Sequence, residues 1–277
     1  MTRPYAEVIG DPVEQSLSPT IHGFWLKALS IDADYGKRRV TRPELPAYLA
    51  EKRADPAWRG SNVTMPLKLD AVALADEVSD RAVAAGAANL LMMREGRLTA
   101  ANTDVGAIAT LLGRLHEAKA GMGSVTVLGN GGAARAALVA LKLVGIANVR
   151  VQARDLAEAR KLAVEFGLET GPAPFTEPIV SDGLVNATPL GMPGRDCLNC
   201  ELQHMPGQGW VFDMAYGPSE TPLIEAAKEA GLKLVDGLDQ HALDAPGDNQ
   251  FCFATFNGAS GGGNRLHVAR REQRQEQ

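Results

Sequence analysis

The chain has 277 residues with a formal charge of −5, and 45% of its residues are hydrophobic against 22% charged. This acidic, globular balance argues against a disordered chain and against a nucleic-acid or membrane-surface partner. No apolar run reaches the roughly 18 residues of a bilayer-spanning helix, and the first residues lack a signal-peptide core. With three cysteines and no export signal, a cytoplasmic protein is expected, and the length suggests two domains.

Strand-like and helix-like segments alternate through the first hundred residues, bounded by Gly, Pro and Asp. Ser18 and Pro19 are suited to the N-cap and first position of a helix. In chain order the predicted elements are a buried strand (5–10), a helix (20–29), a strand (35–40), a helix (43–53), a short strand (61–64), a helix (66–78) and a strand pair (88–94 and 98–101) that turns at Glu95-Gly96.

A second series follows, beginning with a strongly periodic helix at 105–118. It continues with a strand (125–128), a helix (133–144), a strand (149–152), a helix (156–166), strands at 183–186 and 210–214, a helix (222–230) and a last strand (232–235). Repeated βαβ units imply parallel sheets covered by helices. The sequence therefore predicts an α/β fold of two α/β domains. Residues 1–104, completed by C-terminal helices at about 238–277, are expected to form one domain with a mainly parallel sheet, and residues 105–237 are expected to form the second.

The segment VTVLGNGGAARAAL is the clearest cofactor signal. Glycines between a strand and a helix allow a sharp turn and let the backbone approach a pyrophosphate. The helix start then offers free N–H groups and a positive dipole end to that phosphate. Ala134 replaces the third glycine of the usual pattern and still permits close packing. The candidate cofactor residues of this loop are Gly129, Asn130, Gly131, Gly132 and Ala133.

The end of the next strand normally selects between NAD and NADP, because an acidic side chain there binds the ribose diol and an arginine accepts the 2′-phosphate. The chain offers both in Arg154 and Asp155, so both cofactors stay open. Cys197 and Cys200 form a single CxxC in a Pro/Gly-rich stretch, without the second ligand pair of a typical zinc site. No metal is predicted.

Several polar residues fall at strand ends of the first domain, where βα loops of parallel sheets gather ligands. They are Ser16, Ser18, Asn62, Thr64, Asn89, Asn102 and Asp104. Lys68 lies in the first turn of a predicted helix, an unfavourable place for a cation. A lysine held there by a carboxylate can accept a proton from a hydroxyl group or stabilise a developing alkoxide.

Seven segments then occur in a fixed order from about residue 5 to about residue 239. They are GDPVEQSLSPTIH from Gly10, GSNVTMPLK from Gly60, GAANLL from Gly86, ANTDVGA from Ala101, GNGGAARAA from Gly129, NATPLGM from Asn186 and VFDMAYGPSETPLI from Val211. In this the chain resembles the shikimate dehydrogenase family, which includes shikimate and quinate dehydrogenases.

The resemblance implies that residues 1–104, with the C-terminal helices, are the substrate-binding domain, and that residues 105–237 are a Rossmann dinucleotide-binding domain. It also implies a role for each matching residue. Lys68 and Asp104 would be the catalytic pair that grips ring hydroxyl groups. The substrate would be bound by Ser16 and Ser18 at its carboxylate and by Asn62, Thr64, Asn89 and Tyr216 elsewhere. The cofactor would border the glycine loop, Arg154, Asp155, Thr188 and Gly237. The implied reaction interconverts shikimate or quinate and its 3-dehydro form by hydride exchange with NAD or NADP.

Three features of the chain depart from the family pattern. Leu90 replaces a threonine, and Ala153 and Asp155 replace the residues that flank the NADP-selecting arginine, which favours NAD. The family's glutamine-bearing helix after Gly237 cannot be recognised in this sequence. The residues that could take the place of that glutamine are Gln240, Asp244 and Gln250, and the sequence does not choose among them.

Two other functions compete with the leading one. A divergent member could act on another cyclic hydroxy acid, such as an aminated analogue, and a dinucleotide-binding regulator could have lost turnover. Retention of both Lys68 and Asp104 argues against the regulator, because a binder needs no such pair. The expected partner is a small cyclic hydroxy acid, with no nucleic acid or membrane, and the chain is expected to be a monomer or a homodimer.

Overall fold

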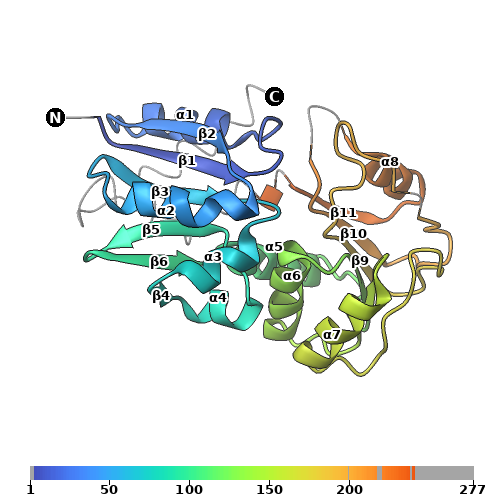
Figure 1. The fold of residues 1–277 in the computed structure, drawn as a ribbon. Coiled ribbons are helices and arrows are strands. Elements are labelled where there is room, and N and C mark those ends of the chain that lie inside the picture. The colour runs from blue at the N-terminus through green and yellow to red at the C-terminus, as the bar shows by residue number, and fades with distance from the viewer. Residues whose placement is uncertain (1–2, 199, 217–219, 238, 241–277) are drawn as a thin grey trace. The chain divides into compact units, whose positions relative to one another are not determined.

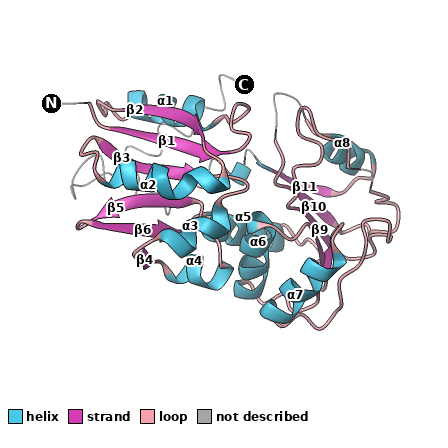
Figure 2. Cartoon of the chain, in the orientation of Figure 1, coloured by secondary structure: helices cyan, strands magenta, loops and turns pink. Residues whose placement is uncertain are grey.

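The computed structural model describes residues 3–198, 200–216, 220–237 and 239–240. These residues form two compact units. The first consists of the described residues up to 83 together with 87–103, and the second of 84–86 together with the described residues from 104 onwards. Each unit combines helices and strands, as Figure 2 shows, so the predicted α/β class is confirmed. Most of the predicted C-terminal segment at 238–277 lies outside the described residues.

The first unit contains a six-stranded sheet in the order β2-β1-β3-β5-β6-β4. Its strands are β1 (Tyr5–Gly10), β2 (Asp34–Arg39), β3 (Trp58–Val63), β4 (Glu77–Val78), β5 (Leu90–Arg94) and β6 (Arg97–Ala101). Strand β1 pairs in parallel with β2 and β3, and β4 pairs in parallel with β6. Strand β5 runs antiparallel to β3 and β6, so the sheet is mainly parallel, with the predicted tight turn at Glu95-Gly96.

The helices of the first unit are α1 (Ser18–Ala28), α2 (Leu45–Arg53) and α3 (Lys68–Leu74), and α4 (Asp80–Ala85) begins in it. A 3-10 turn, η1 (Arg42–Glu44), precedes α2. Helices α2 and α3 lie across one face of the sheet (Figure 1), over a core that includes the fully buried Leu45, Leu67 and Leu91. This apolar layer fixes the loops at the ends of the strands.

Two local predictions were wrong. The helix predicted for 66–78 is shorter, because Glu77 and Val78 leave the helix and pair with Thr99 and Ala100 as strand β4. Pairing with a distant strand overrides the helical spacing of the apolar residues. Ser18 is not the N-cap of α1 either. Leu17 holds that position, and the Ser18 N–H donates to the Ser16 hydroxyl at 3.3 Å.

The second unit contains a five-stranded, fully parallel sheet in the order β11-β10-β9-β7-β8. Its strands are β7 (Val125–Leu128), β8 (Val149–Gln152), β9 (Gly183–Asn186), β10 (Trp210–Asp213) and β11 (Lys233–Asp236). An isolated bridge from Gln152 to Ala173 extends the sheet beyond β8. The strand order reverses between β7 and β9, and open α/β sheets bind ligands beyond the carboxyl ends of the strands at such a point. The predicted Rossmann sheet is confirmed.

Its helices are α5 (Asp104–Glu117), α6 (Gly132–Leu143), α7 (Leu156–Phe166) and α8 (Pro222–Glu229). Helix α5 packs against α6, while α8 packs against β10 and β11 (Figure 1). Trp210, Phe212 and Leu128 are fully buried in this unit. Among the residues described, no helix has the combined length and apolar character that a membrane crossing requires.

Candidate active site

Polar residues of the first unit meet at the carboxyl ends of β1 and β3. The Thr64 N–H donates to the Ile9 carbonyl at 2.9 Å, which joins the two strand ends. The Val63 N–H donates to the Asn89 carbonyl at 2.8 Å, and the Ala88 N–H donates to the Lys68 carbonyl at 2.7 Å. The backbone therefore brings Thr64, Lys68 and Asn89 to one edge of the sheet, although they are distant in sequence.

Ser16 and Ser18 form a hydroxyl pair in the loop after β1. The Ser16 hydroxyl donates to the Ser18 hydroxyl over 3.1 Å, and Ser18 is buried. Each hydroxyl group can also donate outward after a rotation about its C–O bond. Two adjacent hydroxyl groups of this kind can bind the two oxygens of one carboxylate.

Asn62 has a partner that the sequence alone does not reveal. The Tyr35 hydroxyl, on β2, donates to Asn62 Oδ1 at 2.6 Å. The Tyr35 ring stacks on the His22 ring of α1, with centroids 4.0 Å apart and planes 2° apart. Because Oδ1 accepts this hydrogen bond, the Asn62 amide is turned so that Nδ2 can donate to a ligand oxygen.

Asn89 binds the segment that precedes α5. Its Nδ2 donates to Thr103 Oγ1 at 2.8 Å, and its Oδ1 accepts from the Thr103 N–H at 2.8 Å. The neighbouring Asn102 Nδ2 donates to the Ala87 carbonyl at 2.8 Å. The turn that leads into Asp104 is thus held by two buried amide side chains.

The two predicted catalytic residues occupy helix starts. Lys68 is the half-buried first residue of α3, and Asp104 is the buried first residue of α5. The Asp104 carboxylate accepts a hydrogen bond from Gln240 Nε2 at 3.1 Å, and Gln240 is also buried. Of the three possible replacements for the family glutamine, Asp244 and Gln250 lie outside the described residues.

The glycine-rich loop joins β7 to α6 at the point of strand reversal. Gly129 has a φ of +102°, and a Cβ there would lie 3.2 Å from the Ala187 carbonyl and 3.0 Å from the Thr188 methyl group. A Cβ on Gly131 would meet no atom within 4 Å. No side chain caps α6, so the N–H groups of its first turn stay available for an anion. Ala134 is fully buried, as close packing in place of the third glycine requires. These features fit a dinucleotide pyrophosphate.

Arg154 and Asp155 follow β8 and differ in their engagement. Asp155 is the N-cap of α7, and its Oδ1 accepts from the N–H groups of Ala157 and Glu158 at 3.0 Å each. Arg154 is exposed, and no ion pair links it to any residue that the structure describes. The Asp155 carboxylate is therefore engaged in capping α7, while the Arg154 guanidinium can reach a ligand. This arrangement does not support the expected preference for NAD.

Gly237 lies where β11 ends. A Cβ at this position would lie 2.8 Å from the Met214 carbonyl, so a glycine allows the close approach of these two segments. Tyr216 is half-buried and follows β10. The Thr188 side chain, two residues after β9, lies beside Gly129, which follows β7 on the other side of the reversal point.

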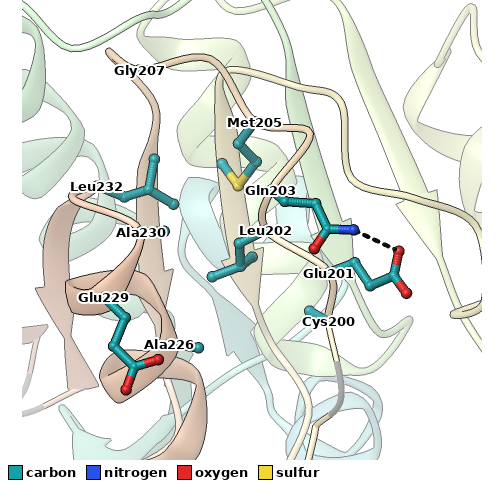
Figure 3. Close-up of a pocket in the computed structure, with 10 residues that line it drawn as sticks. All are labelled: Cys200, Glu201, Leu202, Gln203, Met205, Gly207, Ala226, Glu229, Ala230 and Leu232. Atoms are coloured by element: carbon teal, nitrogen blue, oxygen red, sulfur yellow. Dashed lines mark hydrogen bonds between the residues drawn. The ribbon is translucent and has the colours of Figure 1, made fainter.

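A cavity of about 470 Å³ lies elsewhere in the second unit, and Figure 3 shows its lining. Cys200, Leu202, Met205 and Leu232 give it an apolar wall, and none of the predicted site residues contributes to it. Burial raises the pKa of the Cys200 thiol to about 11, which keeps it protonated and disfavours a thiolate ligand. In the described part of the chain, no group of three or more potential ligands could hold a metal ion.

The chain is similar over most of its length to proteins of known identity. Residues 8–91 match the family described as the shikimate dehydrogenase substrate binding domain. Shikimate dehydrogenase (NADP(+)) of Sphingopyxis alaskensis is 42% identical over 238 residues, which cover 85% of this chain and 86% of that protein.

Solved structures agree. Shikimate 5-dehydrogenase of Thermus thermophilus, in complex with NADP(H) and shikimate, is 33% identical with a TM-score of 0.78, and the match covers 97% of this chain and 99% of that one. Shikimate dehydrogenase of Aquifex aeolicus is 29% identical with a TM-score of 0.80, over 97% of this chain and 98% of that one. This chain belongs to the shikimate dehydrogenase family of oxidoreductases.

Proposed function

We propose that this protein is an NADP-dependent shikimate dehydrogenase, which interconverts shikimate and 3-dehydroshikimate. The observation that carries the proposal is the sequence match of 42% with a shikimate dehydrogenase (NADP(+)), joined to the polar cluster at the sheet edge of the first unit. The test is an absorbance assay at the nicotinamide band with shikimate and quinate against both dinucleotides. Turnover of shikimate with NADP is expected, and failure to oxidise either acid would contradict the proposal.

The hydroxyl and amide groups of the first unit suit a small hydroxylated acid. Ser16 and Ser18 would donate to its carboxylate, while Asn62, Thr64 and Asn89 would bind oxygens on the ring. Tyr216 would also bind the substrate. These assignments follow the family motifs, and the hydrogen bond from Tyr35 to Asn62 Oδ1 turns the Asn62 Nδ2 group toward a ligand oxygen.

Lys68 and Asp104 would carry the proton chemistry. The nicotinamide, when bound, supplies or accepts the hydride. The Lys68 amine accepts the hydroxyl proton during oxidation, and as an ammonium it returns that proton to the carbonyl oxygen during reduction. The Asp104 carboxylate orients this amine and accepts a hydrogen bond from the adjacent hydroxyl group. The lysine supplies the positive charge at the reacting oxygen, so the chemistry needs no metal.

Gln240 is the residue we select in place of the family glutamine. Its Nε2 donates to Asp104 Oδ1, and both side chains are buried. A hydrogen bond from an amide fixes the direction of the carboxylate. Gln240 would therefore orient Asp104 while its carbonyl oxygen stays available to a substrate hydroxyl group.

The cofactor proposal favours NADP over NAD. The relative from Sphingopyxis is named an NADP(+) enzyme, and the Asp155 carboxylate is engaged as a helix cap. The exposed Arg154 guanidinium can pair with a 2′-phosphate. The cytoplasmic location and the monomeric or homodimeric state stay predictions.

Replacing Arg154 with alanine should raise the dissociation constant for NADP by about 10- to 100-fold, because a charge-assisted hydrogen bond contributes about 1.5–3 kcal/mol. Affinity for NAD should change less than twofold, since NAD has no 2′-phosphate. Fluorescence titration with both dinucleotides measures the effect. The matched control is Arg160→Ala, which removes an exposed arginine of α7 and should leave the dissociation constants for NAD and NADP unchanged. Equal losses for NAD and NADP would exclude Arg154 from phosphate recognition.

Replacing Tyr35 with phenylalanine should raise KM for shikimate about fivefold and leave kcat nearly unchanged. The lost hydroxyl frees Asn62 to rotate, and one hydrogen bond contributes about 1 kcal/mol. Tyr5→Phe is the control, because the Tyr5 hydroxyl bonds instead to Asp55 and Lys52. Steady-state kinetics for the two variants separate the roles. A KM that rises equally in both would show that Tyr35 does not act through Asn62.

A further inference from the structure

Asp213 is a buried carboxylate that the proposed mechanism does not use. It ends β10 and has no exposed surface. Its Oδ1 accepts from Asn186 Nδ2 at 2.8 Å and from the Ala215 N–H at 3.0 Å. The Thr221 hydroxyl donates to its Oδ2. One carboxylate thus joins the carboxyl ends of β9 and β10 to the start of α8.

The hydrogen bonds continue from Asp213 to Thr188. Asn186 Oδ1 accepts from the Thr188 N–H at 3.0 Å and from the Thr188 hydroxyl at 2.7 Å. The Leu190 N–H donates in turn to Thr188 Oγ1 at 3.2 Å. An ionised carboxylate can only accept, so it turns the Asn186 amide with Nδ2 toward Asp213 and Oδ1 toward Thr188. The Thr188 side chain is thereby fixed beside Gly129 of the glycine-rich loop.

The same carboxylate holds the chain on both sides of Tyr216. The Ala215 N–H, one residue before Tyr216, donates to Asp213. Thr221, five residues after it, donates to Asp213 and accepts from the Ile224 N–H as the N-cap of α8. The backbone directly before Tyr216 and the start of α8 therefore share one acceptor.

Keeping the Asp213 carboxylate ionised lowers the stability of the folded state. Burial, reinforced by the Asp236 carboxylate, raises the pKa of the Asp213 carboxyl group to about 6. The neighbouring Cys200 thiol supplies no positive charge, and no cation pairs with Asp213 among the residues described. Because this pKa is above the unfolded value, stability is greatest below that value and is lost as pH rises through about 6. A buried charge retained at such a cost favours a functional role.

We propose that Asp213 is a positioning residue that holds the Thr188 loop in the conformation that binds the dinucleotide. The proposal rests on the proposed function, since it assigns this edge of the sheet to NADP. Asp213 acts through Asn186 and Thr188 and touches no ligand itself.

The test measures NADP affinity of the full chain by isothermal titration calorimetry for Asp213→Ala, Thr188→Ala and the double variant. About fivefold to tenfold weaker binding is expected for Asp213→Ala, with the double variant no weaker than the weaker single variant. Asp182→Ala is the matched control. Asp182 also accepts two backbone N–H groups, from Gly123 and Ser124, but at the amino-terminal edge of the same sheet. Additive losses, or equal losses in the Asp182 control, would overturn the proposal.

If the Asp213→Ala protein does not fold, Asp213→Asn provides the test, because asparagine keeps the shape of the side chain and mimics the protonated carboxyl group. NADP affinity of the parent should fall as pH drops through about 6, and the difference between parent and Asp213→Asn should vanish at pH 5. Titration of the NADP phosphate affects both proteins equally. A difference that does not change with pH refutes the role of Asp213 alone, whereas a parent that binds no dinucleotide refutes the proposed function as well.

Discussion

Replacing Lys68 with methionine is expected to lower kcat for shikimate oxidation by about 100- to 10,000-fold, the range typical of a lost general acid–base group. Methionine retains the length of the side chain and removes the amine. Because Lys68 is the first residue of α3 and not part of the glycine-rich loop, NADP affinity should not change. Stopped-flow or steady-state measurement of NADPH absorbance gives the rate, and calorimetry gives the affinity.

The control for this variant is Lys27→Met, which removes an exposed lysine from the last turn of α1. Its kcat should equal that of the parent. Asp104→Asn should lower kcat as well, because an amide cannot orient the amine as a carboxylate does. A Lys68→Met protein that turns over at the parental rate would remove Lys68 from catalysis, and with it the proton exchange proposed above.

Replacing Lys52 with methionine is expected to lower the free energy of unfolding by about 3 kcal/mol, because it leaves a buried carboxylate without its cation. Lys52 Nζ lies 3.0 Å from Glu7 Oε1, and both side chains are nearly buried. The ammonium also donates to the Tyr5 hydroxyl at 2.7 Å. Burial raises the pKa of Tyr48, so its hydroxyl stays protonated and donates to Glu7 at 2.9 Å. Urea unfolding at pH 7 measures the loss.

Two further variants show whether the charge is responsible. Lys52→Met combined with Glu7→Gln should recover more than half of the loss, because removing both charges of a buried pair is nearly neutral. Lys161→Met breaks an exposed ion pair with Glu158 and should change stability by less than about 0.5 kcal/mol. A Lys52→Met protein as stable as the Lys161 control would show that the buried pair contributes little.

The sequence by itself determined the elements that depend on local pattern. Strands β7, β8 and β9 and helix α7 begin and end at the predicted residues, because apolar runs and helical spacing there are bounded by glycine or a capping residue. The glycine-rich loop was also predictable from sequence, since the φ of +102° at Gly129 is a conformation that most other residues avoid. Family motifs supplied the candidate site residues in the same way.

Only the tertiary structure decided what those residues contact. Strand β4 exists because of a pairing with β6, and Tyr35 bonds to Asn62 from 27 residues away. The engagement of Asp155 as a helix cap and the acceptor role of Asp213 also depend on donors that a motif does not specify. Local pattern fixes backbone conformation, whereas hydrogen-bond partners depend on which segments the packed core brings together.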